Sequence, residues 1–269
     1  MCIRDRTQED SVAAEVRTER HGAAATVIFD NQARRNAVTF DMWLAVPKIC
    51  AELQNDDSVR VIVLRGAGDT AFVAGADISQ FGDRKPGAGD YDAATSGAFG
   101  AIENLKKPVV ALIHGFCIGG GLALAAAADI RYAADDAQFG LPPARLGIGY
   151  SGQGTAKLVD LLGPAVTKEI IYTADWYDAA TALRWGLVNH VCVKAELDAF
   201  VAERVETIAS RAPLSQVAAK LAVADHLRSP QDGPSPEVSA AIQACADSAD
   251  YAEGVQAFGE KRTPNFSGR

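Results

Sequence analysis

The sequence predicts an α/β fold with parallel strands, because a strand, a glycine loop and a helix follow one another twice along the chain. The two strands, residues 60–65 (RVIVLR) and 109–113 (VVALI), have continuous apolar centres, a pattern typical of strands covered on both faces. Parallel neighbours need crossover connections, which the intervening helices can supply. The chain has 269 residues, of which 48% are hydrophobic, so it also has enough apolar material for a core.

The N-terminal part of the chain predicts a hairpin followed by a helix. Residues 12–17 and 25–30 have the composition of short strands, and a His–Gly pair between them marks the turn. Residues 39–53 carry apolar side chains at helical spacing. Pro47 lies inside this segment, so we expect it to kink or shorten the helix.

The remaining chain predicts more short strands and helices and then a long helical region. A helix is expected to begin at Asp77, after the first glycine loop, and another is expected over residues 122–129. Short strands are expected at 130–133 and 138–140. From residue 201 onward almost every segment has helical periodicity.

Three segments are not expected to form regular structure. Residues 82–89 (GDRKPGAG) have the composition of a mobile surface loop, and residues 229–236 that of a linker inside the helical tail. The first six residues, MCIRDR, resemble the translated end of a sequencing-library adapter. These six residues are therefore left out of the fold prediction.

Composition and charge exclude several classes of function. The net charge of −8 would repel a phosphate backbone, and the 26 basic residues are scattered along the chain, so nucleic acid is not an expected partner. The apolar runs fall well short of the roughly 20 residues that a membrane helix needs. The five cysteines lie far apart without a CxxC pair, which indicates neither a metal site nor disulfides and is typical of a cytoplasmic protein.

The two glycine loops, residues 71–78 (AFVAGADI) and 115–122 (GFCIGGGL), are the main candidates for a site. Each follows an apolar strand and opens a helix, so each offers backbone N–H groups at a positive helix end. Neighbouring parallel strands would bring the loops together, and one N–H from each could bind a single oxygen as an oxyanion hole. Tight strand-to-helix packing is the alternative reason for the small residues. A dinucleotide site is less favoured, because the spacing is not GxGxxG.

Six segments together resemble the enoyl-CoA hydratase/isomerase (crotonase) superfamily, in order and in spacing, from about residue 12 to residue 266. They are FDNQARRNAV, AFVAGADI, HGFCIGGGLALAAAADI, FGLPPARLGIGYSGQGTAKL, AATALRWGLVNHV and FGEKRTPNF. The resemblance implies a spiral of ββα units with a helical C-terminal trimerisation region. The expected division is a core with the acyl-CoA site at 7–200 and an oligomerisation region at 201–269.

The resemblance also implies site residues and partners. The oxyanion donors would be the N–H groups of Ala76 and Gly120. Residues expected to contact the substrate or its coenzyme A part are Arg35, Ala37, Ala74, Asp77, Ile78, Gly119, Ala123 and Pro143, joined by Phe258 and Lys261 of a neighbouring subunit. Coenzyme A would enter as part of an acyl-CoA thioester, with no separate cofactor and no metal. The expected assembly is a homotrimer or a dimer of trimers.

The chain departs from the hydratases of this superfamily at both acidic positions. Where those enzymes carry glutamates, this sequence has Ala123 and Pro143. Hydration needs a base to activate water and an acid to protonate carbon, and alanine and proline can do neither. Decarboxylation of a malonyl-type CoA, or another base-free reaction such as hydrolysis, is therefore favoured over classical hydration. Tyr150 matches a tyrosine of the methylmalonyl-CoA decarboxylases, although a packing role with a locally satisfied hydroxyl stays open.

Other polar residues could replace the missing acids. Glu103 and Tyr91 follow the predicted mobile loop and could reach the pocket, although solvated helix positions are the default for such residues. His114 is expected to be a hydrogen-bonded structural histidine, and Asp129 to satisfy backbone donors. Arg145 could hold a carboxylate, or pair with one of the aspartates at 135 and 136.

Three functions therefore remain open from the sequence. The first is a lyase or hydrolase that uses the oxyanion hole alone. The second is a hydratase or isomerase with a relocated acid. The third is a non-catalytic acyl-CoA-binding or assembly protein. The two intact glycine loops favour an enzyme, since a scaffold has no need of paired N–H donors.

Overall fold

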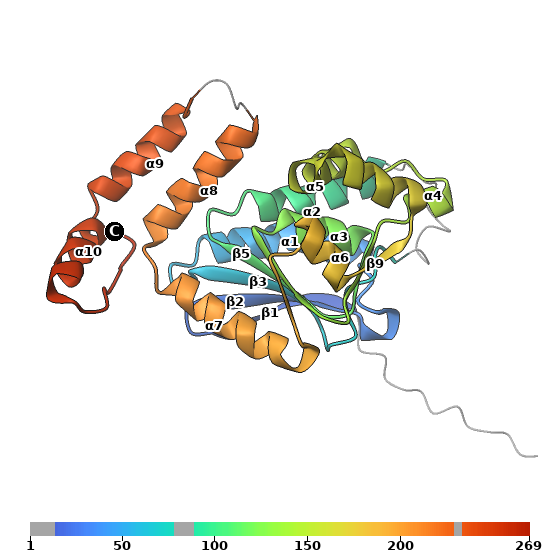
Figure 1. The fold of residues 1–269 in the computed structure, drawn as a ribbon, viewed down its shortest axis with the longest axis horizontal. Coiled ribbons are helices and arrows are strands. Elements are labelled where there is room, and N and C mark those ends of the chain that lie inside the picture. Colours follow the sequence, from blue (N-terminus) through green and yellow to red (C-terminus); the bar gives the residue numbers. More distant parts are fainter. Residues whose placement is uncertain (1–13, 78–88, 229–232) are drawn as a thin grey trace, which may run out of the picture.

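The computed structural model of the chain describes residues 14–77, 89–228 and 233–269 (Figure 1). Several predictions lie outside these residues: the start of the first strand, the helix start after Asp77, most of the loop at 82–89, and residues 229–232 of the predicted linker. Ile78, an expected substrate contact, also lies outside them. Among the described residues, no helix is both long enough and apolar enough to cross a membrane.

The main sheet has six strands in the order β1-β2-β3-β5-β7-β10. Its strands are β1 (Glu15–His21), β2 (Ala24–Asp30), β3 (Val61–Gly66), β5 (Val109–Ile113), β7 (Ile130–Ala134) and β10 (His190–Cys192). Only the β1–β2 hairpin is antiparallel, and every later pair in this sheet is parallel. The predicted α/β class with parallel pairing is therefore confirmed.

A second sheet of four strands, in the order β4-β6-β8-β9, was not expected as a separate unit. Its strands are β4 (Ala71–Val73), β6 (Phe116–Ile118), β8 (Gln138–Gly140) and β9 (Trp176–Asp178). The sequence predicted that the strand at 109–113 runs directly into the glycine loop, which is wrong. The chain instead turns at Gly115 and forms β6, and only glycine fits this turn, because φ is +53° and a Cβ atom would lie 1.9 Å from the Thr70 carbonyl oxygen.

Both faces of the main sheet are covered, as the continuous apolar strands predicted. Ile62 and Leu64 of β3 belong to the larger core, which contacts the helices beside the second sheet. Val61 and Val63 face the other way, into a smaller cluster with α7 (Leu197–Ala209). The helices on the larger-core side are α1 (Phe40–Gln54), α2 (Gly89–Glu103), α3 (Gly120–Ala127), α4 (Pro143–Leu146), α5 (Gly152–Thr173) and α6 (Ala179–Trp185). Helix α1 continues through Pro47 to Gln54, so it is not shortened.

Three C-terminal helices stand beside this core rather than within it (Figure 1). They are α8 (Pro213–Arg228), α9 (Pro236–Ala246) and α10 (Ala249–Glu260). Short 3₁₀ turns at Gln32–Arg34 and Lys194–Glu196 complete the described elements. The helical character predicted from residue 201 is confirmed, but the expected boundary at 200 falls inside α7, which packs on the main sheet. The separate helical unit begins with α8, after Ala209.

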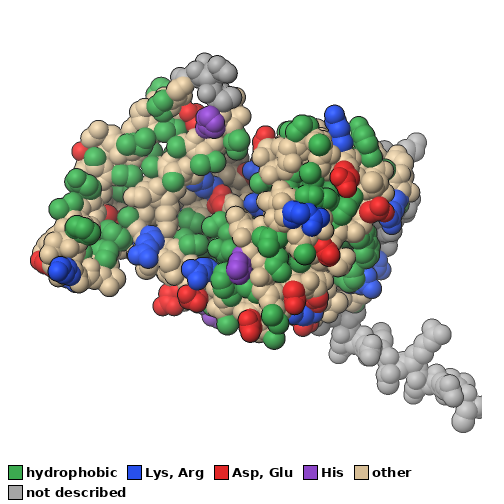
Figure 2. Space-filling view, viewed as in Figure 1, with side chains coloured by type: hydrophobic (Ala, Val, Ile, Leu, Met, Phe, Trp, Pro, Cys, Tyr) green, Lys and Arg blue, Asp and Glu red, His purple; other side chains and the backbone are tan. Residues whose placement is uncertain are grey.

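Polar contacts connect the C-terminal helices to the core. Arg60, beside β3, donates to the carbonyl oxygens of Ala209 at 3.2 Å and Phe266 at 2.6 Å. Lys220 of α8 contacts the Asp129 carboxylate at 2.8 Å. The space-filling view shows many apolar side chains on the surface of these helices and a hollow between them and the core (Figure 2).

Candidate active site

The two glycine loops lie next to each other because the strands before them are neighbours in the second sheet. Strands β4 and β6 pair in parallel, so both chains leave the sheet at the same edge. A Cβ atom on Gly120 would lie 3.8 Å from the Ala76 nitrogen. The predicted juxtaposition of the loops is present, but β4 and β6 produce it rather than the main-sheet strands.

The amide groups of Ala76 and Gly120 are available for a ligand. Val38 forms a parallel bridge beside Ala76, but its hydrogen bonds use the Gly75 oxygen (2.9 Å) and the Asp77 nitrogen (3.0 Å). Gly120 is the first residue of α3, where an N–H has no acceptor within the helix. Across the described parts of the chain, neither amide has a hydrogen-bond acceptor. Two neighbouring unused N–H groups can bind one oxygen that becomes negatively charged.

The three consecutive glycines are required for three different reasons. Gly119 has φ of +57°, a conformation that other residues rarely adopt. At Gly121 a Cβ atom would lie 2.0 Å from the Val73 carbonyl oxygen, so strand and helix approach too closely for any side chain. At Gly120 it would lie 3.1 Å from Cζ2 of Trp43 and 3.8 Å from the Ala76 nitrogen. The packing alternative thus explains Gly121, whereas Gly120 borders the two unused amides.

The positions expected to hold catalytic acids are apolar. Ala123 is buried on α3, one turn after the glycines, and its amide donates to the Gly119 oxygen. Pro143 is the first residue of α4 and is half-buried.

Neither of the two side chains that could replace the missing acids is a free solvated side chain. Glu103 forms an ion pair with Lys157 at 3.8 Å, and the half-buried Tyr91 hydroxyl accepts a hydrogen bond from Trp43 Nε1 at 3.0 Å.

Tyr150 packs against the larger core and the start of α5. A Cβ atom on Gly154 would lie 2.8 Å from the Tyr150 hydroxyl oxygen, so Gly154 leaves room for the phenol. The predicted packing role is therefore present, but among the described residues the hydroxyl has no hydrogen-bond partner. Burial raises the pKa of Tyr150 to about 12. The phenol is neutral near pH 7 and can act as a hydrogen-bond or proton donor.

The segment around Arg35 is held against the loop that carries Ala76. The Ala74 amide donates to the Arg35 carbonyl oxygen at 3.0 Å, and the Arg34 guanidinium contacts the buried Asp77 carboxylate at 2.8 Å. Arg35 is left-handed, with φ of 52°, and its guanidinium lies over the ring of Phe116. The structure thus brings together four of the expected contact residues, Arg35, Ala37, Ala74 and Asp77.

Asn36 organises this segment, a role that the sequence analysis did not assign to it. Its side-chain amide donates to the carbonyl oxygens of Ala67 (3.0 Å) and Ala71 (2.8 Å), and its side-chain oxygen accepts from the Asn31 amide. The residue is buried and left-handed, with φ of 57°. Asparagine tolerates this conformation better than most residues, so an asparagine inside an otherwise basic and apolar stretch is the signal that could have found it.

Phe258 and Lys261 do not reach the glycine loops of their own chain. Phe258 is 88% exposed near the end of α10, and Lys261 is the left-handed residue that caps this helix. Figure 1 shows α10 on the opposite side of the molecule from α3 and α4. Their expected contact with substrate therefore requires a second copy of the chain and stays a prediction.

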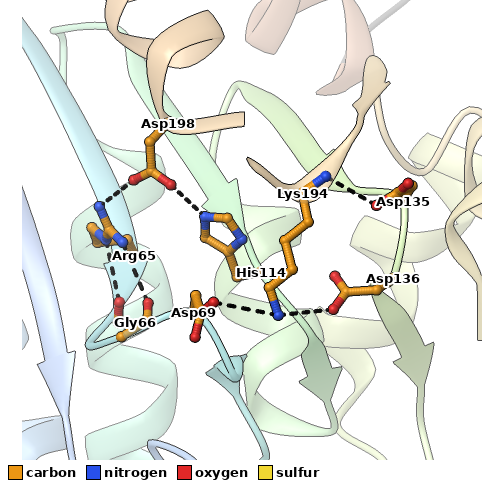
Figure 3. A network of polar contacts seen from close by, with 9 residues as sticks. Arg65, Gly66, Asp69, His114, Asp135, Asp136, Lys194 and Asp198 are labelled. Atoms are coloured by element: carbon orange, nitrogen blue, oxygen red, sulfur yellow. Dashed lines mark hydrogen bonds and ion pairs between the residues drawn. The ribbon is translucent and has the colours of Figure 1, made fainter. Parts of the chain in front are cut away.

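His114, directly after β5, forms part of a polar network (Figure 3). Its Nε2 lies 2.6 Å from the Asp198 carboxylate, which also binds Arg65 at 2.7 Å, so the expected hydrogen-bonded histidine is confirmed. Its Nδ1 is buried and has no partner among the described residues. Burial opposes the charge on Asp198, but the His114 hydrogen bond and the Arg65 charge together lower the pKa of this carboxyl group.

The remaining polar predictions have mixed outcomes. Asp129 accepts from the Val109 amide at 2.8 Å, as expected of a residue that satisfies backbone donors. Arg145 does not pair with either of the aspartates at 135 and 136. Instead it contacts Asp175 at 3.2 Å. The aspartates at 135 and 136 accept from Lys194, one from its backbone amide and the other from its side chain.

A cavity of about 810 Å³ lies away from the glycine loops. It is formed between β1, β2, β3 and α7, with an apolar floor that includes Val63, Leu112 and Val205. These residues belong to the smaller cluster, on the sheet face opposite to the larger core. A second hollow, of about 430 Å³, lies between α1 and α2 and includes Trp43 in its wall.

Comparison with known proteins decides the family. Residues 19–269 match the family model for enoyl-CoA hydratase/isomerase. The chain belongs to the enoyl-CoA hydratase/isomerase family. This family member is 35% identical to the short-chain-enoyl-CoA hydratase of Clostridium acetobutylicum, in an alignment that covers 91% of this chain and 94% of that protein. It is also 33% identical to the carnitinyl-CoA dehydratase of Citrobacter koseri, in an alignment that covers 93% of this chain and 97% of that protein.

Solved structures of the family have the same fold. A structure from Magnetospirillum magneticum described as an enoyl-CoA hydratase/carnithine racemase is 34% identical, with a TM-score of 0.90 over 94% of this chain and 96% of that one. An enoyl-CoA hydratase structure from Bacillus anthracis is 30% identical to this chain, with a TM-score of 0.87 over 94% of this chain and 99% of that one. The predicted crotonase-like fold of this enoyl-CoA hydratase/isomerase family member is confirmed.

Proposed function

We propose that this family member is an enzyme that acts on an acyl-CoA thioester. The thioester carbonyl oxygen binds to the amides of Ala76 and Gly120, and these two donors stabilise the enolate that forms when charge moves onto that oxygen. The observation that supports this proposal is the pair of neighbouring amides without an acceptor in the described chain. A donor of this kind typically contributes on the order of 3 to 4 kcal/mol to the transition state.

The favoured reaction is decarboxylation of a malonyl-type CoA ester. The bond between the α carbon and the carboxylate breaks, carbon dioxide leaves, and the bonding electrons form the enolate. The neutral Tyr150 hydroxyl, or water, then protonates the α carbon. No base is needed, which suits a site with Ala123 and Pro143 at the acidic positions of hydratases. An apolar surrounding also destabilises the substrate carboxylate before it leaves.

Hydration of an enoyl-CoA is the second candidate. It is favoured by relatives named short-chain-enoyl-CoA hydratase and, from Syntrophomonas wolfei, crotonyl-CoA hydratase, the latter 34% identical to this chain. An acid from another position would then have to act. Glu103 is the first candidate, and it would have to leave its ion pair with Lys157.

A paired assay separates the two reactions. Loss of enoyl absorbance is followed with crotonyl-CoA, and release of carbon dioxide is followed with methylmalonyl-CoA. We expect decarboxylation, with hydration at least about a hundredfold slower than in an enzyme with both glutamates. The double variant Ala123→Glu with Pro143→Glu should raise hydration and lower decarboxylation. Fast hydration that is lost in Glu103→Gln would support the second candidate.

Binding of both thioesters without turnover would favour the non-catalytic alternative. Turnover to free acid and coenzyme A would favour hydrolysis. We further propose that the enzyme acts in the cytoplasm as a homotrimer or a dimer of trimers. In that assembly, Phe258 and Lys261 of one subunit would contact the coenzyme A bound to another. The exposure of Phe258 supports this arrangement.

A further inference from the structure

Trp43 is the side chain that borders the proposed oxyanion donors. It lies on α1 and is fully buried. Its ring carbons Cζ2 and Cη2 would be 3.1 Å and 3.4 Å from a Cβ atom on Gly120, and the Ala76 nitrogen would be 3.8 Å from the same point. The benzene edge of the indole and both amides therefore surround one small volume beside Gly120.

The position of the indole is fixed from α2. Its Nε1 donates to the Tyr91 hydroxyl at 3.0 Å, and its ring meets the ring of Phe99 edge-on, with centroids 5.3 Å apart. The Phe40 ring stacks on Tyr91 with centroids 6.2 Å apart. A buried aromatic side chain with these contacts cannot rotate away without breaking the hydrogen bond and repacking both helices.

Trp43 also forms part of the wall of the hollow between α1 and α2. This hollow has a volume of about 430 Å³, and its other wall residues are Phe40, Leu44, Pro47, Asp90, Ala93, Ala94 and Gly97. Apart from Asp90 the wall is apolar or glycine, which suits a hydrocarbon chain. Trp43 thus borders both this hollow and the unused amides.

We infer that Trp43 determines the chain length of the substrate, because it closes the acyl end of the site and restricts the enzyme to short-chain acyl-CoA thioesters. The inference rests on the acyl-CoA site of the proposed function. A thioester whose oxygen is bound to the two amides places its acyl carbons beside the indole edge. A long chain would have to pass through the volume that the indole fills in order to reach the hollow.

Removal of the indole should therefore open a path for long chains. Binding can be measured with two unreactive thioethers, S-butyl-CoA and S-decyl-CoA, by titration calorimetry. We expect the wild-type chain to bind S-butyl-CoA at least as tightly as S-decyl-CoA. We expect Trp43→Ala to bind S-decyl-CoA at least about tenfold more tightly than the wild type, since burial of two methylene groups has an effect of that size. Trp43→Phe, which keeps an aromatic ring in the core, should show a smaller gain in the same direction.

Gly97 offers a matched control on the opposite wall of the hollow. It is exposed on α2, and a Cβ atom there would have nothing within 4 Å, so Gly97→Leu can partly fill the hollow without a clash. Alone it should leave the affinity for S-butyl-CoA unchanged. Combined with Trp43→Ala it should remove most of the gain in S-decyl-CoA affinity.

Each outcome discriminates between the possibilities. If folded Trp43→Ala and Trp43→Phe, checked by circular dichroism, bind both thioethers with the wild-type preference, Trp43 does not set chain length and the inference is wrong, while the proposed function stands. If the wild type binds S-decyl-CoA more tightly than S-butyl-CoA, the inference is likewise wrong and the proposed function stands. Failure of the wild type to bind either thioether would overturn the proposed acyl-CoA site and the inference together.

Discussion

The sheet-and-helix core and the C-terminal helices α8, α9 and α10 bury their apolar side chains to very different extents. In the core, large side chains such as Phe29, Trp43 and Phe72 are completely buried. In the C-terminal helices, six large apolar side chains are at least half exposed, namely those of Val223, Leu227, Ile242, Tyr251, Val255 and Phe258. The core also has exposed apolar residues, such as Tyr172, but they lie over a large buried interior. Among the described residues of α8, α9 and α10, the buried apolar side chains are Ala218, Val238 and Ala257, so these helices present an apolar surface with little interior of their own, as surfaces that bind a partner do.

The largest expected effect tests the core side of this comparison. Ala76→Pro and Gly120→Pro each delete one of the two unused amides, and each should lower turnover by about 10² to 10³-fold. For Ala76→Pro the circular dichroism spectrum and the oligomer mass should stay as in the wild type, because this amide takes part in no hydrogen bond within the described chain. Gly120→Pro also places side-chain atoms against Trp43, so its turnover is compared only after the same two measurements show a folded oligomer. Unchanged turnover in a folded variant would refute the oxyanion role.

The next effect tests the C-terminal helices. The double variant Val255→Asp with Phe258→Asp places charges on exposed apolar positions of α10, where a partner would have to desolvate them. We expect light scattering to show a trimer or hexamer for the wild type and a monomer with a folded core for the variant. Tyr172→Asp, at an exposed aromatic position of the core, is the matched control and should leave the mass unchanged. A fully active monomeric wild type would contradict this prediction.

A smaller effect concerns the proton donor of the core. Tyr150→Phe removes the hydroxyl but keeps the ring that packs beside Gly154. If Tyr150 protonates the enolate, release of carbon dioxide from methylmalonyl-CoA should fall by about tenfold or more, while coenzyme A affinity changes little. Equal turnover by the two proteins would assign Tyr150 a packing role only.

The smallest expected effect concerns Asp198 of α7, whose carboxylate contacts His114 and Arg65 of the core. The pKa of Asp198 is lowered in the folded protein, so its contribution to the free energy of unfolding is present above the pKa of the unfolded carboxyl group. That contribution is lost as the pH falls through the lowered folded value. Asp198→Asn should therefore lower the melting temperature near pH 7, and the difference from the wild type should shrink as the pH falls below the ordinary aspartate pKa of about 3.9.

Asp175 provides the control for this measurement. Its pair with Arg145 is exposed on both sides, and such pairs contribute little to stability. Asp175→Asn should therefore change the melting temperature much less than Asp198→Asn does at neutral pH. A constant difference between wild type and Asp198→Asn from neutral to acidic pH would show that the His114–Asp198 contact is not charge-dependent.

Much of the fold and part of the site could be predicted because their signals are local. The continuous apolar strands at 60–65 and 109–113 predicted burial on both faces, and the structure has β3 between two apolar clusters. Of the second sheet, the strand at 138–140 was predicted, but strands β4 and β6 and the separate sheet that they form were not. Strands of three residues, such as β4 and β6, are too short for a periodic pattern, and the turn at Gly115 is decided by its contact with Thr70.

The sequence by itself determined the family, the absence of carboxylates at positions 123 and 143, and the glycines that could expose amide groups. These properties depend on residue identity and spacing, which folding does not change. Only the tertiary structure decided that residue 121 must be glycine because the Val73 carbonyl oxygen leaves no room for a Cβ atom. It also decided that Trp43 lies against Gly120 and that Arg145 pairs with Asp175. The physical reason is that each of these contacts joins residues far apart in the chain, and the packing of strands and helices alone sets which side chains meet.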